Sequence, residues 1–341
     1  MSATVAPASR TSGPLSAPGS RRRMVVVLGI LSVLTVLIAF GLLAWGNPMP
    51  VGTPGFWRIA QLRVTTLIVL ALVAIAQATA TVAFQTVTEN RIITPSIMGF
   101  ESLYTAVQTG AVYALGVAGV TAVKGPWQFA LQVAIMVGLA MALYGWLLRG
   151  RYGNLQIMLL IGIIIGGGLG AVSTFMQRLL TPSEFDVLAA RLFGSVANAD
   201  PSTLPIAIPL VLIAAAALWG GSRRLNVMAL GRAAATSLGV NHRGELLRTL
   251  FFVAVLIATS TALVGPMVFL GFLVATLAYQ FADTYDHRYV FPVAVLTAFV
   301  VLAGAYFTMK NVFYAQGVVS IIIEIVGGAV FLLVILRKGR L

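Results

Sequence analysis

The chain has 341 residues, of which 59% are hydrophobic and only 9% carry a charge. A soluble domain of this length could not bury so much apolar surface, and the apolar runs are too long and continuous for the alternating strands of a β-barrel. The composition therefore predicts an all-α polytopic membrane protein. No cysteine is present, which excludes disulfides, thiolate metal sites and cysteine nucleophiles.

The formal net charge of +13 raises the question of a nucleic-acid partner. The basic residues, however, lie in short loops between apolar runs, as the positive-inside rule describes for membrane proteins. We therefore expect contact with the lipid membrane and no binding of nucleic acid.

Residues 1–23 are rich in Ser, Ala, Pro and Gly, contain no acid, and end in three consecutive arginines. This composition is typical of a disordered cytosolic tail. The apolar run from Met24 to Ala44 is too long for a signal peptide and lacks a small-x-small cleavage site. It is expected to be the first membrane helix of a single transmembrane domain over residues 24–341.

Nine more apolar segments are long enough to cross a bilayer. They cover roughly 64–84, 94–118, 127–148, 155–177, 203–220, 246–264, 266–282, 289–309 and 314–336. Ten spans put both termini in the cytosol, and this topology places sixteen basic residues inside and six outside. The six outside are Arg58, Arg63, Lys124, Arg178, Arg191 and Lys310. The predicted location is the bacterial cell membrane.

The segment from Leu225 to Arg243 lies between two of these spans but is neither apolar nor long enough to be one. Small, helix-compatible alanines are flanked by Gly231 and Gly239, which indicates an ordered structure. An ordered, mostly uncharged cytosolic segment predicts a docking site for a partner.

No nucleotide-hydrolysis motif is present, because none of the three lysines follows a glycine. Gly-x-Ser-x-Gly and His-Glu-x-x-His are also missing, and the only histidines are His242 and His287. The sequence therefore predicts no enzyme activity and no catalytic residue. If ATP hydrolysis drives this protein, another chain performs it.

One short cytosolic loop could hold a metal. Asp283, Asp286 and His287 supply ligands of the kind found in membrane prenyltransferases, which makes a membrane-embedded enzyme one alternative. The other interpretation is a polar turn in which the acids balance Arg288. We favour the turn, because no second acidic cluster faces the loop, and expect no metal site.

Glu324 lies in the middle of the last span, where a charge is costly. It could carry protons in a secondary transporter, or hydrogen-bond to a neighbouring helix or a second subunit. The structural role is favoured because no second buried acid is expected, Glu101 being placed near the membrane interface. In the fifth span, Gly162, Gly166 and Gly170 either allow close helix packing or leave a pathway free of side chains.

Four stretches occur in the same order as in one family of permeases. They are Gln85 with Thr88-Glu89-Asn90-Arg91-Ile92-Ile93-Thr94-Pro95-Ser96-Ile97-Met98-Gly99, Leu230-Gly231 with Ser237-Leu238-Gly239-Val240, Gly265-Pro266-Met267-Val268-Phe269-Leu270-Gly271, and Gln316-Gly317-Val318-Val319. They are similar to that family's Q…NPLADPxxLG, LG…SLGV and GPIxFxG signatures and to its last helix. From about residue 60 onward, the chain thus resembles the FecCD/BtuC type of permease, the transmembrane subunits of iron-siderophore and cobalamin ABC importers.

The chain also departs from this pattern. It keeps only the first arginine of the family's RLPR, at Arg63, and its Asn90–Pro95 stretch replaces NPLADP. Ala275-Thr276 stands where many members have Pro-His, and Gly327-Gly328-Ala329 where many have Gly-Ala-Pro. These variants are similar to a ferric-siderophore branch whose members often pair with a second, different permease.

The resemblance implies a type II ABC importer permease of ten helices that moves iron(III)-siderophore complexes into the cytoplasm. It further implies a second permease subunit, homologous or identical, two cytosolic ABC ATPases and an extracytoplasmic siderophore-binding protein. We expect no cofactor on this chain, since ATP and magnesium would be held by the ATPases. A proton-coupled secondary transporter stays the first alternative.

The resemblance also suggests where each partner and the substrate would meet this chain. The predicted ATPase-coupling residues are Leu230, Gly231, Arg232, Ser237, Leu238, Gly239 and Val240. The predicted translocation-pathway residues are Gln85, Asn90, Pro95, Gly99, Gly162, Gly166 and Gly170. The predicted binding-protein contacts are Arg58, Arg63 and Lys310.

Overall fold

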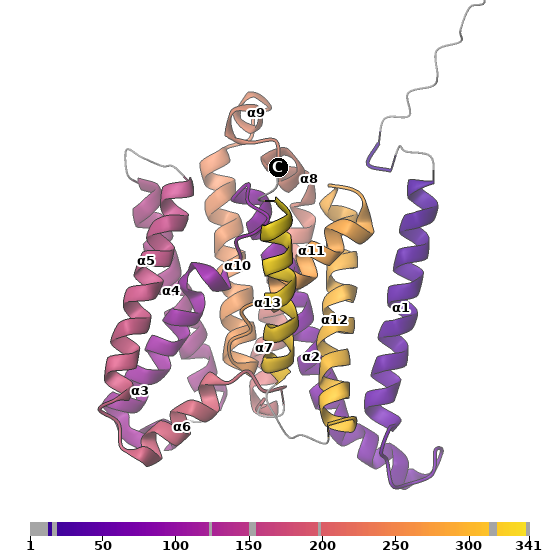
Figure 1. Ribbon diagram of the computed structural model, residues 1–341, viewed down its shortest axis with the longest axis vertical. Coiled ribbons are helices and arrows are strands. Elements are labelled where there is room, and N and C mark those ends of the chain that lie inside the picture. Colours follow the sequence, from indigo (N-terminus) through magenta and orange to yellow (C-terminus); the bar gives the residue numbers. More distant parts are fainter. Residues whose placement is uncertain are drawn as a thin grey trace, which may run out of the picture.

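A computed structural model of the chain describes residues 13–15, 19–122, 125–149, 155–196, 199–313 and 319–338. Long helices run side by side between two ends of the molecule, and connecting segments lie at those ends (Figure 1). The short helices α8 (Ser222–Met228) and α9 (Arg232–Ser237) lie at the same end as the start of α1 and the end of α13 (Figure 1). This shared end is the predicted cytosolic side.

Eight helices of the described residues are long and apolar enough to cross a membrane, and two shorter apolar helices complete the ten predicted segments. The ten are α1 (Ser20–Ala44), α2 (Pro54–Val87), α3 (Glu101–Ala122), α4 (Pro126–Arg149), α5 (Leu155–Gln177), α7 (Leu204–Gly220), α10 (His242–Val264), α11 (Leu270–Ala282), α12 (His287–Asn311) and α13 (Val319–Lys338). Two further short helices, α6 (Pro182–Leu192) and the 3-10 turn η3 (Pro201–Thr203), lie in the connection between α5 and α7.

Helix α2 is the centre of the bundle. Most of its C-terminal two-thirds is buried, and it packs against α10, α12, α7 and α11. Alanine and threonine dominate this part of the helix, and small side chains allow neighbouring helices to approach closely. The helix begins ten residues earlier than expected, because Thr53 caps its first turn by accepting a hydrogen bond from Phe56 N and Pro54 occupies the first helical position.

Two membrane helices are interrupted by glycine. A π-helical turn, η1 (Ser96–Phe100), precedes α3 and contains Gly99 at φ 105°. Between α10 and α11, Gly265 has φ 85° and packs against Gly194, and Ser195 N donates to Val264 O at 2.7 Å. Non-helical backbone at membrane depth is stable only where protein covers it. Both breaks meet this condition.

The arginines assigned to the N-terminal tail belong instead to a helix. Helix α1 begins at Ser20, so Arg21, Arg22 and Arg23 form its first turn. Arg23 forms an ion pair with Asp283 at 2.7 Å and donates to Gln280 O at 2.8 Å. Of the tail itself, residues 1–12 and 16–18 lie outside the described residues.

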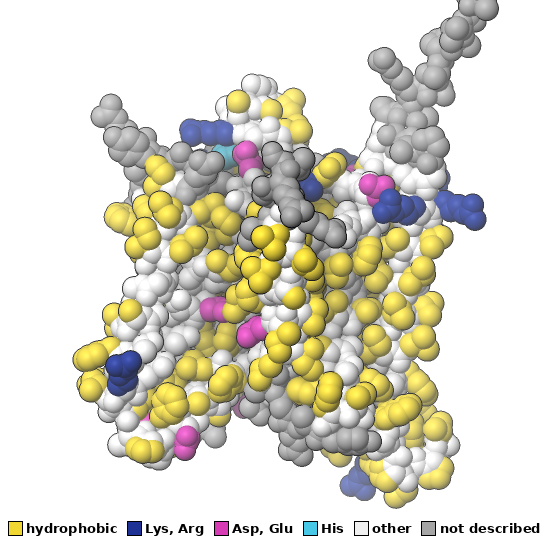
Figure 2. Space-filling view, in the orientation of Figure 1, with side chains coloured by type: hydrophobic (Ala, Val, Ile, Leu, Met, Phe, Trp, Pro, Cys, Tyr) yellow, Lys and Arg dark blue, Asp and Glu magenta, His cyan; other side chains and the backbone are white. Residues whose placement is uncertain are grey.

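The surface agrees with a membrane location. Hydrophobic side chains cover the flanks of the helices, and most Lys and Arg side chains in view lie toward the two ends (Figure 2). Acidic side chains are also visible midway between the ends (Figure 2). A membrane would place those acids far from either aqueous phase.

Candidate functional site

The predicted docking segment is ordered. It consists of α8, α9 and the first residues of α10, joined by two tight connections. Gly231 precedes α9 with φ 89° and Gly239 follows it with φ 81°. Side chains other than glycine are strained in this left-handed region, so the two glycines set the shape of the connections.

The outer surface of this segment is apolar. Leu230 is 62% exposed and Leu238 is 63% exposed, whereas Leu225 and Met228 of α8 and Ala235 of α9 are buried. The remaining predicted contact residues divide in the same way, with Arg232, Ser237 and Gly239 exposed and Gly231 and Val240 half-buried. Exposed leucines with a basic rim at a cytosolic end are typical of a protein-binding surface.

The docking segment touches the turn that connects α2 to η1. A Cβ atom on Gly231 would lie 3.6 Å from the Glu89 carboxylate. Glu89 itself has φ 51°, a conformation that non-glycine residues seldom adopt. The contact joins the docking segment to one of the candidate pathway stretches.

Gln85 and Asn90 hold that turn in place. Gln85 Nε2 donates to Arg91 O at 2.7 Å, and Asn90 Oδ1 accepts from the backbone nitrogens of Ile92 and Ile93. Pro95 then stands at the start of η1. In this structure these three predicted pathway residues shape the backbone, and a role in lining the pathway stays a prediction.

The glycine strip of α5 is filled by η1. A Cβ on Gly166 would lie 2.9 Å from Gly99 Cα, and one on Gly162 would lie 3.2 Å from Met98 O. Gly170 faces Ser102 more loosely, at 4.0 Å from its Oγ. Close packing, the first of the two interpretations, therefore accounts for Gly162 and Gly166.

Of the predicted binding-protein contacts, Arg63 forms hydrogen bonds within the chain itself. Its guanidinium donates to the carbonyl oxygens of Leu42, Leu43, Trp45 and Gly46, at 2.6 to 3.4 Å. These carbonyls belong to the C-terminal end of α1 and the loop after it, where backbone acceptors lack partners in the helix. The structure thus gives Arg63 a capping role.

The other two predicted contacts differ from Arg63 in their exposure. Arg58, near the start of α2, and Lys310, near the end of α12, are both exposed. These helix ends lie opposite α9 (Figure 1). The Lys310 ammonium lies 5.9 Å from the centre of the Tyr306 ring. These two side chains remain available to a partner.

The candidate metal ligands are used in other ways. Asp283 pairs with Arg23, and Asp286 accepts from Arg288 Nη2 at 2.8 Å and from Asn226 Nδ2 at 3.0 Å. Partial burial alone would raise the pKa of Asp286, but the hydrogen bonds from Arg288 and Asn226 outweigh it and lower the pKa from 3.8 to about 2. No group of three His, Cys, Asp or Glu side chains within the described ranges could hold a metal ion.

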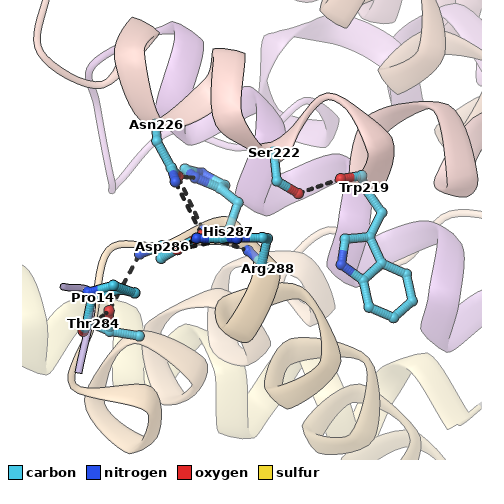
Figure 3. A network of polar contacts seen from close by, with 8 residues as sticks. All are labelled: Pro14, Trp219, Ser222, Asn226, Thr284, Asp286, His287 and Arg288. Atoms are coloured by element: carbon cyan, nitrogen blue, oxygen red, sulfur yellow. Dashed lines mark hydrogen bonds and ion pairs between the residues drawn. The ribbon is translucent and has the colours of Figure 1, made fainter.

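His287 is buried and belongs to a polar network that the sequence did not reveal (Figure 3). Its backbone nitrogen and its Nδ1 lie 3.0 and 2.6 Å from Asn226 Oδ1, and its Nε2 lies 2.6 Å from Thr86 Oγ1. The network connects α8, α12 and α2. Because Asn226 is one polar residue within the docking segment, no spacing or motif marked it.

Glu101 is not near the membrane interface. It follows η1, which packs against the middle of α5, and its Oε1 is buried without a hydrogen-bond partner in the described part of the chain. Glu101 and Glu324 thus both lie in membrane-spanning helices, α3 and α13. The expectation that no second buried acid accompanies Glu324 was therefore wrong.

Comparison with known proteins identifies the family. The model of the FecCD transport family matches residues 24–337. The chain belongs to this family. The petrobactin import system permease protein FatC of Bacillus anthracis is 50% identical over 98% of this chain and 94% of its own. The petrobactin import system permease protein YclO of Bacillus subtilis is 35% identical over 82% of this chain and 88% of its own.

Among solved structures, a metal-chelate-type ABC transporter in an inward-facing conformation superposes on this FecCD chain with a TM-score of 0.78. The match covers 92% of this chain and 99% of that chain, at 20% sequence identity, and so concerns the fold. The predicted family, the type II permease fold, the non-enzymatic transport role and the multi-pass bacterial membrane location are confirmed.

Proposed function

We propose that this chain is the transmembrane permease of an ABC importer for a ferric siderophore of the petrobactin class. The observation that carries the substrate assignment is the 50% identity to FatC along nearly the whole of both chains. YclO, whose name gives the same substrate, supports it.

The chemistry of the bundle agrees with a chelated cargo. A free metal ion would need several His, Cys or carboxylate ligands close together along its route. The described residues contain no group of three such side chains that could hold a metal ion. A metal already held by a siderophore needs only space and weak contacts. Iron would therefore enter this pathway as a complex.

The proposed partners are a second permease subunit, two cytosolic ABC ATPases and an extracytoplasmic siderophore-binding protein. The ATPases would contact α8 and α9 through Leu230, Gly231, Arg232, Ser237, Leu238, Gly239 and Val240. The binding protein would contact Arg58 and Lys310, and such exposed charges affect the association rate more than the affinity. Arg63 is left out of this surface.

Cross-linking tests the ATPase contact, and the absence of cysteine makes single-cysteine variants specific. Leu238→Cys should form a disulfide with a cysteine introduced in the ATPase groove. Leu179→Cys is similarly exposed but lies after α5, at the opposite end, and should not react. Equal labelling of both variants, or of neither, would contradict the proposed docking.

Gene deletion tests the substrate. Loss of this chain should abolish cellular uptake of iron-55 supplied as petrobactin, and expression of the wild-type chain should restore it. Uptake of an unrelated ferric siderophore measures specificity. Normal petrobactin uptake in the deletion strain, with no second system for it, would refute the assignment.

A proton-coupled transporter is the second candidate, because Glu101 and Glu324 place two acids in membrane-spanning helices. Intramembrane acids are candidate proton carriers by default. The family membership favours ATP as the energy source. The two mechanisms differ in their response to neutral variants of Glu101 and Glu324.

A further inference from the structure

The buried network around His287 links the docking segment, through Asn226, to α2 at the centre of the bundle, through Thr86. Figure 3 shows the Asn226, Asp286, His287 and Arg288 part of this network. Asn226 lies on α8, His287 at the start of α12, and Thr86 in the last turn of α2. His287 and Thr86 are both buried, and Asn226 is half-buried. Hydrogen bonds in such a setting are stronger than in water, and their loss is correspondingly costly.

The neighbouring ion pair fixes the orientation of the Asn226 amide. Asn226 Nδ2 donates to Asp286 Oδ1 at 3.0 Å, and Asp286 is held in turn by the guanidinium of Arg288. The amide oxygen of Asn226 therefore faces His287 and accepts from its backbone N–H. Since a carbonyl oxygen can only accept, His287 Nδ1 must carry a proton.

The other ring nitrogen of His287 meets the Thr86 hydroxyl, which also contacts Val82 O and the Tyr279 side chain. With Nδ1 protonated, Nε2 of the neutral ring accepts from Thr86 Oγ1 at 2.6 Å. The same hydroxyl lies 2.8 Å from Val82 O, one turn earlier in α2. Because it has one proton, Thr86 either ties α2 to α12 or bonds within its own helix.

The position of Thr86 gives this choice a structural consequence. Its neighbour Gln85 holds the turn after α2 through Arg91 O, and that turn leads into η1. Gly99 of η1 packs against Gly166 in the middle of α5. If a displacement of α8 reaches Thr86, only the turn between α2 and η1 separates it from the Gly99–Gly166 contact in the middle of the bundle.

We propose that Asn226, His287 and Thr86 form a positioning relay that transmits movement of the docking segment to the end of α2. The inference rests on the proposed docking of ATPases to α8 and α9. The single proton of the Thr86 hydroxyl can be donated to His287 Nε2 or to Val82 O, and a choice of this kind is what a switching element requires. None of the three residues needs to touch the substrate or ATP.

The test uses the assembled importer, purified through a tag on this chain and reconstituted with its binding protein. Thr86→Val removes the hydroxyl at nearly constant volume, and Thr88→Val is a matched control. Thr88, the C-cap residue directly after α2, is also buried, and its hydroxyl donates to Phe84 O, four residues earlier, at 2.8 Å. The readout is the amount of ferric petrobactin transported per ATP hydrolysed.

We expect Thr86→Val to lower this ratio about fivefold or more, within the usual range of coupling energies. ATPase activity should persist, Thr86→Ser should restore the ratio, and Thr88→Val should match the wild type. Equal ratios for Thr86→Val and Thr88→Val would overturn the relay. A wild-type importer that does not couple ATP to uptake would instead refute the proposed function.

Two further measurements separate loss of the relay from loss of folding. All variants are compared by size-exclusion chromatography and thermal unfolding in detergent. If Asn226 and Thr86 act in series, Asn226→Ala combined with Thr86→Val should transport no less per ATP than the weaker single variant. Independent, multiplying defects would overturn the relay even where every variant folds.

Discussion

The backbone of Gly99 in η1 lies directly against Gly166 in the middle of α5, with 2.9 Å between Gly99 Cα and the position that a Cβ on residue 166 would take. Real Cβ atoms do not come this close to backbone, so any side chain at 166 would push η1 away from α5. The contact holds a non-helical turn at membrane depth, where it needs protein on every side.

Gly166→Ala should therefore destabilise the protein by about 1–3 kcal/mol, the usual cost of overpacking a core. Gly167→Ala is the matched control, because nothing lies within 4 Å of its Cβ position. Thermal unfolding in detergent compares the two variants. Equal unfolding temperatures would show that η1 does not depend on this contact.

This contact also shows what the sequence could predict. Four-residue spacing of Gly162, Gly166 and Gly170 predicted either close packing or a pathway free of side chains, and the structure shows close packing at Gly162 and Gly166. The partner in the contact was not predictable, because η1 comes from a distant part of the chain and its bend depends on Gly99 at φ 105°. Apolar length predicted the ten helices, but not breaks of this kind.

The basic residues show a second limit of the sequence. The positive-inside rule assigned Arg63 to the outside, and the family resemblance made it a docking residue. The structure instead directs its guanidinium to four carbonyl oxygens at the end of α1. A charge count over loops cannot detect a helix cap that is formed by another helix.

Arg63→Gln should destabilise the α1–α2 connection by about 1–2 kcal/mol, because the part-buried carbonyls of Leu42 and Leu43 lose a donor. Arg58→Gln should leave stability unchanged, since Arg58 is exposed. The association rate of the binding protein should depend on Arg58 and not on Arg63. Arg58→Gln should slow its association at low salt, whereas Arg63→Gln should not do so once the folded fractions are matched.

Hydrogen exchange in the loop between α1 and α2 and surface plasmon resonance measure these two effects. Slower association with Arg63→Gln alone would restore Arg63 to the docking surface.

Asp286 should make stability depend on pH in a definite direction. Its folded-state pKa of about 2 lies below the usual 3.8, so the ionised form is the one that folding stabilises. The contribution is present at pH values above about 4 and is lost as the pH falls toward 2. A shift of this size corresponds to about 2 kcal/mol.

Asp286→Asn should thus lower stability at pH 7, keep about half of this effect near pH 3 and lose most of it only near pH 2. Asp283→Asn is the control, because the Asp283–Arg23 pair is exposed and such pairs contribute little. Tryptophan fluorescence during thermal unfolding, at several pH values, provides the measurement. A penalty for Asp286→Asn that is constant across this range would contradict the assigned pKa.

Glu101 and Glu324 separate the two possible energy sources. Glu101→Gln and Glu324→Gln, alone and together, keep the shape of each side chain but remove its ability to carry a proton. An ATP-driven importer should retain at least about half of its uptake with each variant. Uptake by a proton carrier would fall to background with either variant at every external pH.

The central claim is that ATP hydrolysed by other subunits drives a ferric siderophore through this chain. The most direct measurement is uptake of iron-55 petrobactin by proteoliposomes that contain the complete importer, with its binding protein outside. The account predicts accumulation only with ATP and magnesium in the lumen, and none with a proton gradient alone. Uptake that follows the proton gradient and does not need ATP would contradict it.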